Sequence, residues 1–199
     1  MKIIVVGIGK VGFTVADQLS NEHHDVTIVD TNEKVLNAVL NNLDVIAVHG
    51  NGASRKVLSE AGVEESDLVI ALTGSDEINL LCCLLATKLG ANGTIARVRN
   101  HVYYEDVRLI KDSLGLSMVI NPEKEAAEEI LRILKYPSAK NIDTFAKGKI
   151  NIVSFTATKN CTLCGQAVKD SFSGLKARAL ACAVERENKI FIPFGDSVI

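Results

Sequence analysis

Three glycines near the amino terminus have the spacing of a loop that could bind phosphate. Gly7, Gly9 and Gly12 follow an apolar run, Lys2–Val6, and open a helical pattern of apolar residues. In such a loop the first glycine allows a tight turn, the second lets the backbone approach a pyrophosphate, and the third brings the helix close to the strand. The free N–H groups at the helix N-terminus would then bind the phosphate oxygens. A glycine turn that only packs a helix against a sheet is the alternative interpretation.

An acidic residue lies where the ribose of a dinucleotide needs a hydrogen-bond acceptor. A second apolar run, Val26–Val29, ends on Asp30, 18 residues after Gly12. Strand, glycine turn, helix, strand and acid is the order that a Rossmann-type dinucleotide site requires. Because a carboxylate repels a 2′-phosphate, Asp30 favours NAD over NADP.

Two arginines end a later apolar run and could meet an anion. Alternation along a strand places Arg97 and Arg99 on the same side. A guanidinium at the end of an otherwise apolar strand needs a partner, because an unpaired buried charge is costly. A ligand phosphate could pair with Arg97, and so could a carboxylate such as Asp76 or Glu77.

The residues that could add catalysis to nucleotide binding are poorly placed. Tyr136 and Lys140 have the spacing of a Tyr-x-x-x-Lys pair, but Pro137 interrupts the helical turn that would stack them. Cys161 and Cys164 have the spacing of metal ligands, but zinc would need two more. We therefore predict no catalytic residue and no metal site, and an NAD-dependent dehydrogenase or reductase is the alternative hypothesis.

The composition is that of a folded protein without a basic surface. The chain has 199 residues, of which 47% are hydrophobic and 23% charged, and its formal net charge is −2. This charge gives no basis for a nucleic-acid partner. The apolar runs have the length of strands, far below the roughly 20 residues that span a membrane. Five cysteines without a secretory pattern indicate reduced thiols in a cytoplasmic protein.

The elements that must position these residues alternate between strand and helix. Apolar runs predict six strands, and helical patterns lie between them; the strands are expected at 2–6, 26–29, 45–48, 67–72, 93–98 and 117–120. This order predicts an α/β fold with a Rossmann-like, doubly wound parallel sheet over residues 1–121. Ligands of such sheets bind beyond the carboxyl ends of the strands, where Gly7, Asp30, Asn51, Thr73 and Arg97 all fall.

The alternation is lost after residue 121. Residues 122–138 predict a helix that begins at Pro122 and is apolar on more than one face. We interpret it as a crossover helix that joins a second subunit, and a cover on the sheet is the alternative. Residues 139–199 predict a smaller α+β domain: a hairpin of strands at 141–146 and 150–156, a short helix within 159–170, and strands at 178–185 and 189–193.

These motifs together resemble the regulator of potassium conductance family, known as RCK or KTN. The resemblance covers the whole chain, and the stretch from Ser75 to Asn79 is more specific than the glycine loop. The matching segments are Lys2–Gly12, Val29-Asp30, Gly50–Ser54, Asp67–Thr73, Ser75–Asn79, Ile95–Arg99 and Asn121-Pro122-Glu123.

The resemblance implies a regulatory protein in which the nucleotide is a signal. It implies NAD or NADH, or ATP or ADP, as ligands, homodimers that assemble into a ring, and a membrane potassium transporter as partner. It places the protein in the cytoplasm, at the inner face of the membrane through that transporter. The binding residues it implies are Gly7, Ile8, Gly9, Lys10 and Val11 for the pyrophosphate, Asp30 for the ribose, Asn51 and Gly52 near the adenine, Thr73 and Gly74 further along, and Arg97 for phosphate.

Two departures from the family pattern are visible. Asn51 stands where the family often has an acid after the glycine that ends the third strand. The chain also stops before a closing Gly-Asp strand that we expect of the C-terminal domain, so the resemblance implies an incomplete domain and a fragment of a longer tandem subunit. A module that binds no nucleotide and acts only through protein contacts is a third hypothesis.

Overall fold

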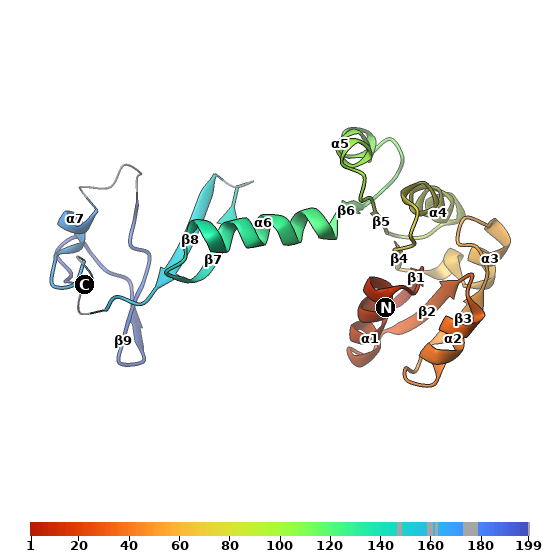
Figure 1. Ribbon diagram of the computed structural model, residues 1–199, viewed down its shortest axis with the longest axis horizontal. Coiled ribbons are helices and arrows are strands. Elements are labelled where there is room, and N and C mark those ends of the chain that lie inside the picture. Colours follow the sequence, from red (N-terminus) through yellow and green to blue (C-terminus); the bar gives the residue numbers. More distant parts are fainter. Residues whose placement is uncertain (147–148, 159–160, 162, 173–178, 199) are drawn as a thin grey trace. The chain divides into compact units, whose positions relative to one another are not determined.

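A computed structural model describes residues 1–146, 149–158, 161, 163–172 and 179–198 of the chain (Figure 1). The chain divides into two compact units, Met1–Glu128 and Glu129–Ile199. Among the described residues, no helix is both long enough and apolar enough to cross a membrane.

The first unit is built on a six-stranded parallel sheet, which confirms the predicted fold class. The strand order is β3-β2-β1-β4-β5-β6, and every neighbouring pair is parallel. β2 and β3 therefore extend the sheet from one side of β1, and β4, β5 and β6 extend it from the other side. The strands are β1 (Lys2–Val6), β2 (Asp25–Asp30), β3 (Ile46–His49), β4 (Leu68–Ala71), β5 (Thr94–Arg97) and β6 (Met118–Ile120).

Helices cover both faces of this sheet, and each face has its own apolar core. The helices are α1 (Lys10–Asn21), α2 (Glu33–Leu40), α3 (Arg55–Glu60), α4 (Asp76–Leu89) and α5 (His101–Ile110), with a 3₁₀ turn at Val63–Glu65. Ile3 and Val5 of β1 pack with α1 and α2, whereas Ile4 and Val6 pack with α3, α4 and α5. Because successive side chains of a strand point to opposite faces, a strand covered on both sides is a continuous apolar run.

Side-chain caps set where several helices begin. Asn32 caps α2 by accepting hydrogen bonds from Lys34 N (3.1 Å) and Val35 N (3.4 Å). Asn100 accepts one from Val102 N (3.0 Å), so α5 begins at His101. The helical pattern between the fifth and sixth strands predicts a helix over 103–114. The observed helix begins earlier, because of the Asn100 cap, and ends at Ile110.

The helix predicted after residue 121 is α6 (Pro122–Lys135). Asn121 precedes it and accepts a hydrogen bond from Lys124 N (2.9 Å). None of the side chains of α6 is buried. Four large apolar residues near its end are exposed, namely Ile130, Leu131, Ile133 and Leu134.

The second unit contains two antiparallel hairpins. Its elements are β7 (Ala139–Phe145), β8 (Ile150–Phe155), α7 (Val168–Ser171), β9 (Val184–Arg186) and β10 (Lys189–Phe191). A tight turn at Glu187 and Asn188, both with positive φ, joins β9 to β10.

Three predictions for the second unit need correction. The predicted helix within 159–170 is reduced to the single turn of α7, and the strand predicted over 178–185 is confined to Val184–Arg186. The strand predicted over 189–193 ends at Phe191 because Pro193 follows closely and has no N–H to pair. Residues 147–148, 159–160, 162 and 178, on which parts of these predictions fall, lie outside the described residues.

Candidate functional site

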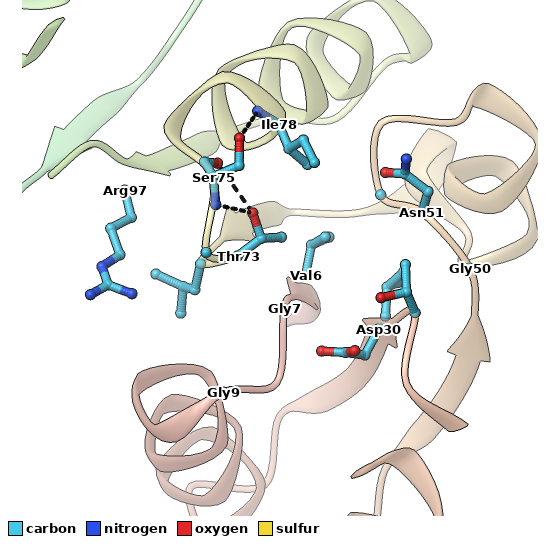
Figure 2. Close-up of a pocket in the computed structure, with 15 residues that line it drawn as sticks. Val6, Gly7, Gly9, Asp30, Gly50, Asn51, Thr73, Ser75, Ile78 and Arg97 are labelled. Carbon is cyan, nitrogen blue, oxygen red and sulfur yellow. Dashed lines mark hydrogen bonds between the residues drawn. The ribbon is translucent and has the colours of Figure 1, made fainter. Parts of the chain in front are cut away.

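A cleft lies at the carboxyl ends of the strands, where the order of the sheet reverses between β1 and β4 (Figure 2). Its volume is about 460 Å³, within the roughly 300–1,000 Å³ typical of small-molecule sites. Binding sites of open α/β sheets occur at this switch point. The residues that line the cleft are Val6, Gly7, Gly9, Val29, Asp30, Thr31, Gly50, Asn51, Gly52, Leu72, Thr73, Gly74, Ser75, Ile78 and Arg97.

Glycine serves a different structural purpose at each of the three positions in the loop. Gly7 has φ +91°, and a Cβ there would lie 2.6 Å from Thr73 N. A Cβ at Gly12 would lie 2.0 Å from the Gly7 carbonyl oxygen, so this glycine lets α1 approach β1. A Cβ at Gly9 would meet no atom within 4 Å. Since Gly9 lines the cleft, its bare backbone keeps that space open.

The N-terminus of α1 has free capacity for an anion. Its N-cap residue, Gly9, has no side chain to accept from the first turn, and that turn contains no acidic residue. By contrast, Ser75 caps α4 by accepting from Ile78 N (3.3 Å), and two acids lie in the first turn of that helix. An anion in the cleft beside Gly9 would satisfy N–H groups that no side chain satisfies.

Asp30 is fixed at the end of β2 by two backbone donors. One carboxylate oxygen accepts from Ile8 N (2.7 Å), and the other accepts from Asn32 N (2.8 Å). The carboxylate thus lies directly beside the glycine loop, with no arginine at positions 31 or 32. A ribose diol in the cleft would meet an acceptor whose position is already set.

A buried amide joins the ends of β4 and β5. Asn79 of α4 is fully buried. Its Oδ1 accepts from Thr73 N (2.8 Å) and Thr73 Oγ1 (2.7 Å), and its Nδ2 donates to the carbonyl oxygen of Arg97 (2.9 Å). These bonds hold two cleft residues, Thr73 and Arg97, in a fixed relation.

Asp76 has a structural role that the sequence did not reveal. Its Oδ2 accepts from Arg99 N (3.0 Å) and Asn100 N (2.8 Å), and Arg99 Nε lies 3.7 Å from Oδ1. Glu77 accepts from Ser75 Oγ (2.7 Å). The acids of the Ser75–Asn79 motif therefore brace the loop after β5 and the start of α4.

The suggested carboxylate partners of Arg97 were wrong. Neither Asp76 nor Glu77 pairs with it; its guanidinium pairs with Glu123 in the first turn of α6. Partial burial raises the pKa of Glu123 and is the largest single cause. The hydrogen bond from Arg97, a backbone hydrogen bond and the charges of Arg97 and Arg99 together outweigh it, so the pKa of this carboxyl lies below its ordinary value. Arg97 also lines the cleft, so one side chain borders both the cleft and the start of α6.

The structure brings most of the predicted binding residues together. Eight line the cleft, namely Gly7, Gly9, Asp30, Asn51, Gly52, Thr73, Gly74 and Arg97. Ile8, Lys10 and Val11 do not line it. Ile8 is buried with its N–H directed to Asp30, Lys10 is exposed at the start of α1, and Val11 packs beside the core of that face.

Sequence reasoning missed the less polar part of the cleft wall. The residues it did not name are Val6, Val29, Thr31, Gly50, Leu72, Ser75 and Ile78. All but one are immediate neighbours of predicted site residues, so the strand ends themselves were the available signal. Ile78 reaches the cleft from the first turn of α4 instead.

The candidates for other chemistry are not among the residues that line the cleft. Cys161 is half-buried and Cys164 exposed, and neither forms a disulfide. Within the described residues, no group of three or more His, Cys, Asp or Glu side chains is placed to hold a metal ion. Cys82 and Cys83 of α4 are buried in the core.

The fold defines a Rossmann-type α/β domain with a cleft at its switch point. Residues 3–122 match the model of the TrkA-N domain family. The chain belongs to this family, which confirms the resemblance inferred from its motifs.

Full-length relatives are potassium uptake proteins. The chain is 35% identical over 199 residues to the Trk system potassium uptake protein TrkA homolog of Archaeoglobus fulgidus, covering all of this chain and 45% of that protein. It is 34% identical over 204 residues to the Trk system potassium uptake protein TrkA of Halomonas elongata, covering 44% of it. The chain thus spans about half the length of the curated relatives it matches.

Solved structures share the fold. The TrkA-N domain of the inner membrane protein YbaL from Escherichia coli superposes with a TM-score of 0.60 at 22% identity, over 67% of this chain and 96% of that one. The structure of GsuK bound to ADP has a TM-score of 0.51 at 26% identity, over 60% of this chain and 31% of that one.

Proposed function

We propose that this chain is a nucleotide-binding regulatory module that controls a membrane potassium transporter of the Trk type. The observation that carries the proposal is the cleft at the β1–β4 switch point, where Asp30 and the uncapped N-terminus of α1 lie side by side. The cleft suits an adenosine ribose at Asp30 and a pyrophosphate at Gly9.

The ligands we assign are NAD or NADH, with ATP or ADP as competing adenine nucleotides. The relatives named as Trk potassium uptake proteins support the transport role, and the GsuK structure bound to ADP supports an adenine nucleotide. In this assignment Gly7, Ile8, Gly9, Lys10 and Val11 surround the pyrophosphate, with Ile8, Lys10 and Val11 contributing through their backbone. Asn51 and Gly52 meet the adenine, and Thr73, Gly74 and Arg97 meet the groups beyond the pyrophosphate.

The module has no catalytic step in this proposal. The described residues that line the cleft include no histidine, tyrosine, lysine or cysteine that could exchange a proton with a substrate. A bound nucleotide would act by preferring one conformation of the assembly, and the shift is limited by that preference.

Residues 122–138 would form the crossover helix between subunits, with residues 1–121 and 139–199 as the domains on either side. The exposed apolar residues of α6 support this role, because burial in a homodimer would remove them from water. Dimers would assemble further into a ring, held in the cytoplasm at the inner face of the membrane by the transporter.

Calorimetric titration with NAD, NADH, ADP and ATP tests the proposal, with light scattering run in parallel for the assembly state. We expect saturable binding of at least one dinucleotide and mutual competition between NADH and ATP. Absence of binding by all four, at a protein concentration that preserves the assembly, would favour a pure interaction module. Turnover of NADH with a panel of carbonyl compounds would revive the dehydrogenase hypothesis.

A further inference from the structure

One arginine that lines the cleft, Arg97, also pairs with a carboxylate that does not line it. The Arg97 side chain is only 13% exposed and pairs with Glu123, whose own side chain is 54% exposed. Arg97 Nε is buried and has no hydrogen-bond partner among the described residues. The guanidinium therefore has donor capacity that its present partner does not use.

The position of Arg97 relative to the other cleft residues sets what it can meet. In Figure 2, Asp30 and Asn51 lie on one side of the cleft and Arg97 lies on the other, with its guanidinium toward the side of Gly9 and α1. A nucleotide with its ribose at Asp30 and its pyrophosphate at Gly9 would direct the group after those phosphates toward Arg97. For ATP that group is a third phosphate, and for NAD it is an uncharged ribose.

Arg97 is the cation that the described lining of the cleft provides. Among its described lining residues, Arg97 is the only one with a positive charge. Arg99 is engaged by the Gly74 carbonyl oxygen and lies beside Asp76. A terminal phosphate could therefore pair with the Arg97 guanidinium, which already pairs with the Glu123 carboxylate.

We propose that the terminal phosphate of a nucleoside triphosphate and the Glu123 carboxylate compete for Arg97. This inference rests on the proposed nucleotide site. When the phosphate takes the guanidinium, Glu123 loses its partner and the first turn of α6 loses its link to β5. A dinucleotide, which brings no third phosphate, leaves the pair intact. The first turn of α6 is thus linked to β5 through Arg97 when a dinucleotide is bound, and it lacks this link when a triphosphate is bound.

The test compares two charge-removing variants of the same turn. Glu123→Gln removes the competitor, whereas Glu125→Gln removes an equal charge from the same turn and leaves the Arg97–Glu123 pair in place. Calorimetry on the full chain should show that Glu123→Gln tightens ATP binding about fivefold or more and changes NAD binding by less than about twofold. Glu125→Gln should change both affinities by less than about twofold.

A double variant separates competition from a general structural effect. Arg97→Gln should weaken ATP more than NAD, and adding Glu123→Gln to Arg97→Gln should then change nothing, because there is no guanidinium to release. Hydrogen exchange of the amides at 123–126 should rise with saturating ATP and not with saturating NAD.

The outcomes distinguish this inference from the proposed function. If wild-type protein binds neither ATP nor NAD, the nucleotide site itself is wrong, and the inference fails with it. If both bind but Glu123→Gln leaves ATP affinity unchanged or weakens it, Glu123 is not a competitor and the inference alone is overturned. Equal tightening of ATP by Glu125→Gln would also overturn it, because the effect would then be one of overall charge.

Discussion

The side-chain amide of Asn79 donates a 2.9 Å hydrogen bond to the carbonyl oxygen of Arg97, across 18 residues of sequence. The same side chain accepts two bonds from Thr73, so one buried residue of α4 ties together the ends of two strands. Within the Ser75–Asn79 motif, Asn79 thus holds the cleft wall in place, whereas Ser75 and Ile78 line the cleft themselves.

Replacing this brace should cost stability. Asn79→Ala leaves the Thr73 N–H and the Arg97 carbonyl without their buried partner, and we expect a loss of about 1–3 kcal/mol in the free energy of unfolding. Chemical denaturation measures it. Asn21→Ala, at an exposed position, should change the same quantity by less than about 0.5 kcal/mol. Similar losses in the two variants would contradict the bracing role.

The glycines of the loop should separate folding from binding. Gly12→Ala places a Cβ 2.0 Å from the Gly7 carbonyl oxygen, so α1 must move and we expect a destabilisation of about 1–3 kcal/mol. Gly9→Ala meets no atom of the protein, and its unfolding free energy should stay within about 1 kcal/mol of wild type. Its Cβ would occupy the cleft, however, so nucleotide affinity should fall. Thermal unfolding measures the stability of both variants, and calorimetry measures their nucleotide affinity. Equal stability and equal affinity in the two variants would refute this separation.

Asp30 should control the choice between NAD and NADP. Asp30→Asn removes the negative charge that repels a 2′-phosphate, so the ratio of the Kd for NADP to that for NAD should fall by about tenfold or more, a change of roughly 1.4 kcal/mol. Competition titrations measure the ratio. Asp25→Asn, at the opposite end of the same strand, is the matched control and should leave the ratio unchanged. If both variants behave alike, Asp30 does not face the ribose.

Four of the five thiols should fall into two groups. Burial raises the pKa of Cys82 from its ordinary 9.0 to about 12 and raises that of Cys83 as well. Both thiols therefore remain protonated at pH 8 in the folded protein and should not react with a disulfide reagent. Cys164 and Cys182 are exposed and should react at once. Mass mapping of the labelled sites checks this.

The same shift has a consequence at high pH. The unfolded chain releases the Cys82 proton above pH 9, whereas the folded chain holds it to about pH 12. The folded state therefore binds more protons in that window, and this contribution to stability is complete below pH 9 and is lost as the pH rises. A Cys82→Ala variant should show a shallower fall between pH 9 and 12 than wild type.

The apolar end of α6 should decide the assembly state. Leu131 and Leu134 are 65% and 69% exposed, and a charge at the centre of an apolar interface opposes association. Leu131→Glu should therefore shift the protein toward monomer in light scattering. Glu128→Gln, also exposed and on the same helix, should not. An unchanged mass for Leu131→Glu would exclude this face as the subunit contact.

The first unit was predictable because its signals are local. A strand buried on both faces must be a continuous apolar run, and β1 and β2 are such runs. Because the strands are parallel, their carboxyl ends meet at one edge of the sheet. Gly7, Asp30 and Asn51 could therefore be placed together from the sequence alone.

The partner of Arg97 was not predictable, because it depends on a packing relation between distant segments. Asp76 and Glu77 were nearer in sequence and chemically equivalent to Glu123. Backbone donors of the loop after β5 already occupy Asp76 Oδ2, and Glu123 reaches Arg97 because β6 pairs beside β5 and α6 begins directly after it. Hydrophobic periodicity carries no information on that choice.

The central position of β1 in the sheet has a consequence for folding during synthesis. Ile3 pairs in register with Leu68, 65 residues later, so at a synthesis rate of about 5–20 residues per second the first strand waits about 3–13 seconds for β4. Pairing with β2 comes earlier and leaves the other side of β1 as an open, apolar edge, the kind of surface that other chains can join. The strand that leads into the glycine loop is thus the one exposed longest on the ribosome. Changes that slow the formation of β4 should therefore appear first as aggregation of newly made chains.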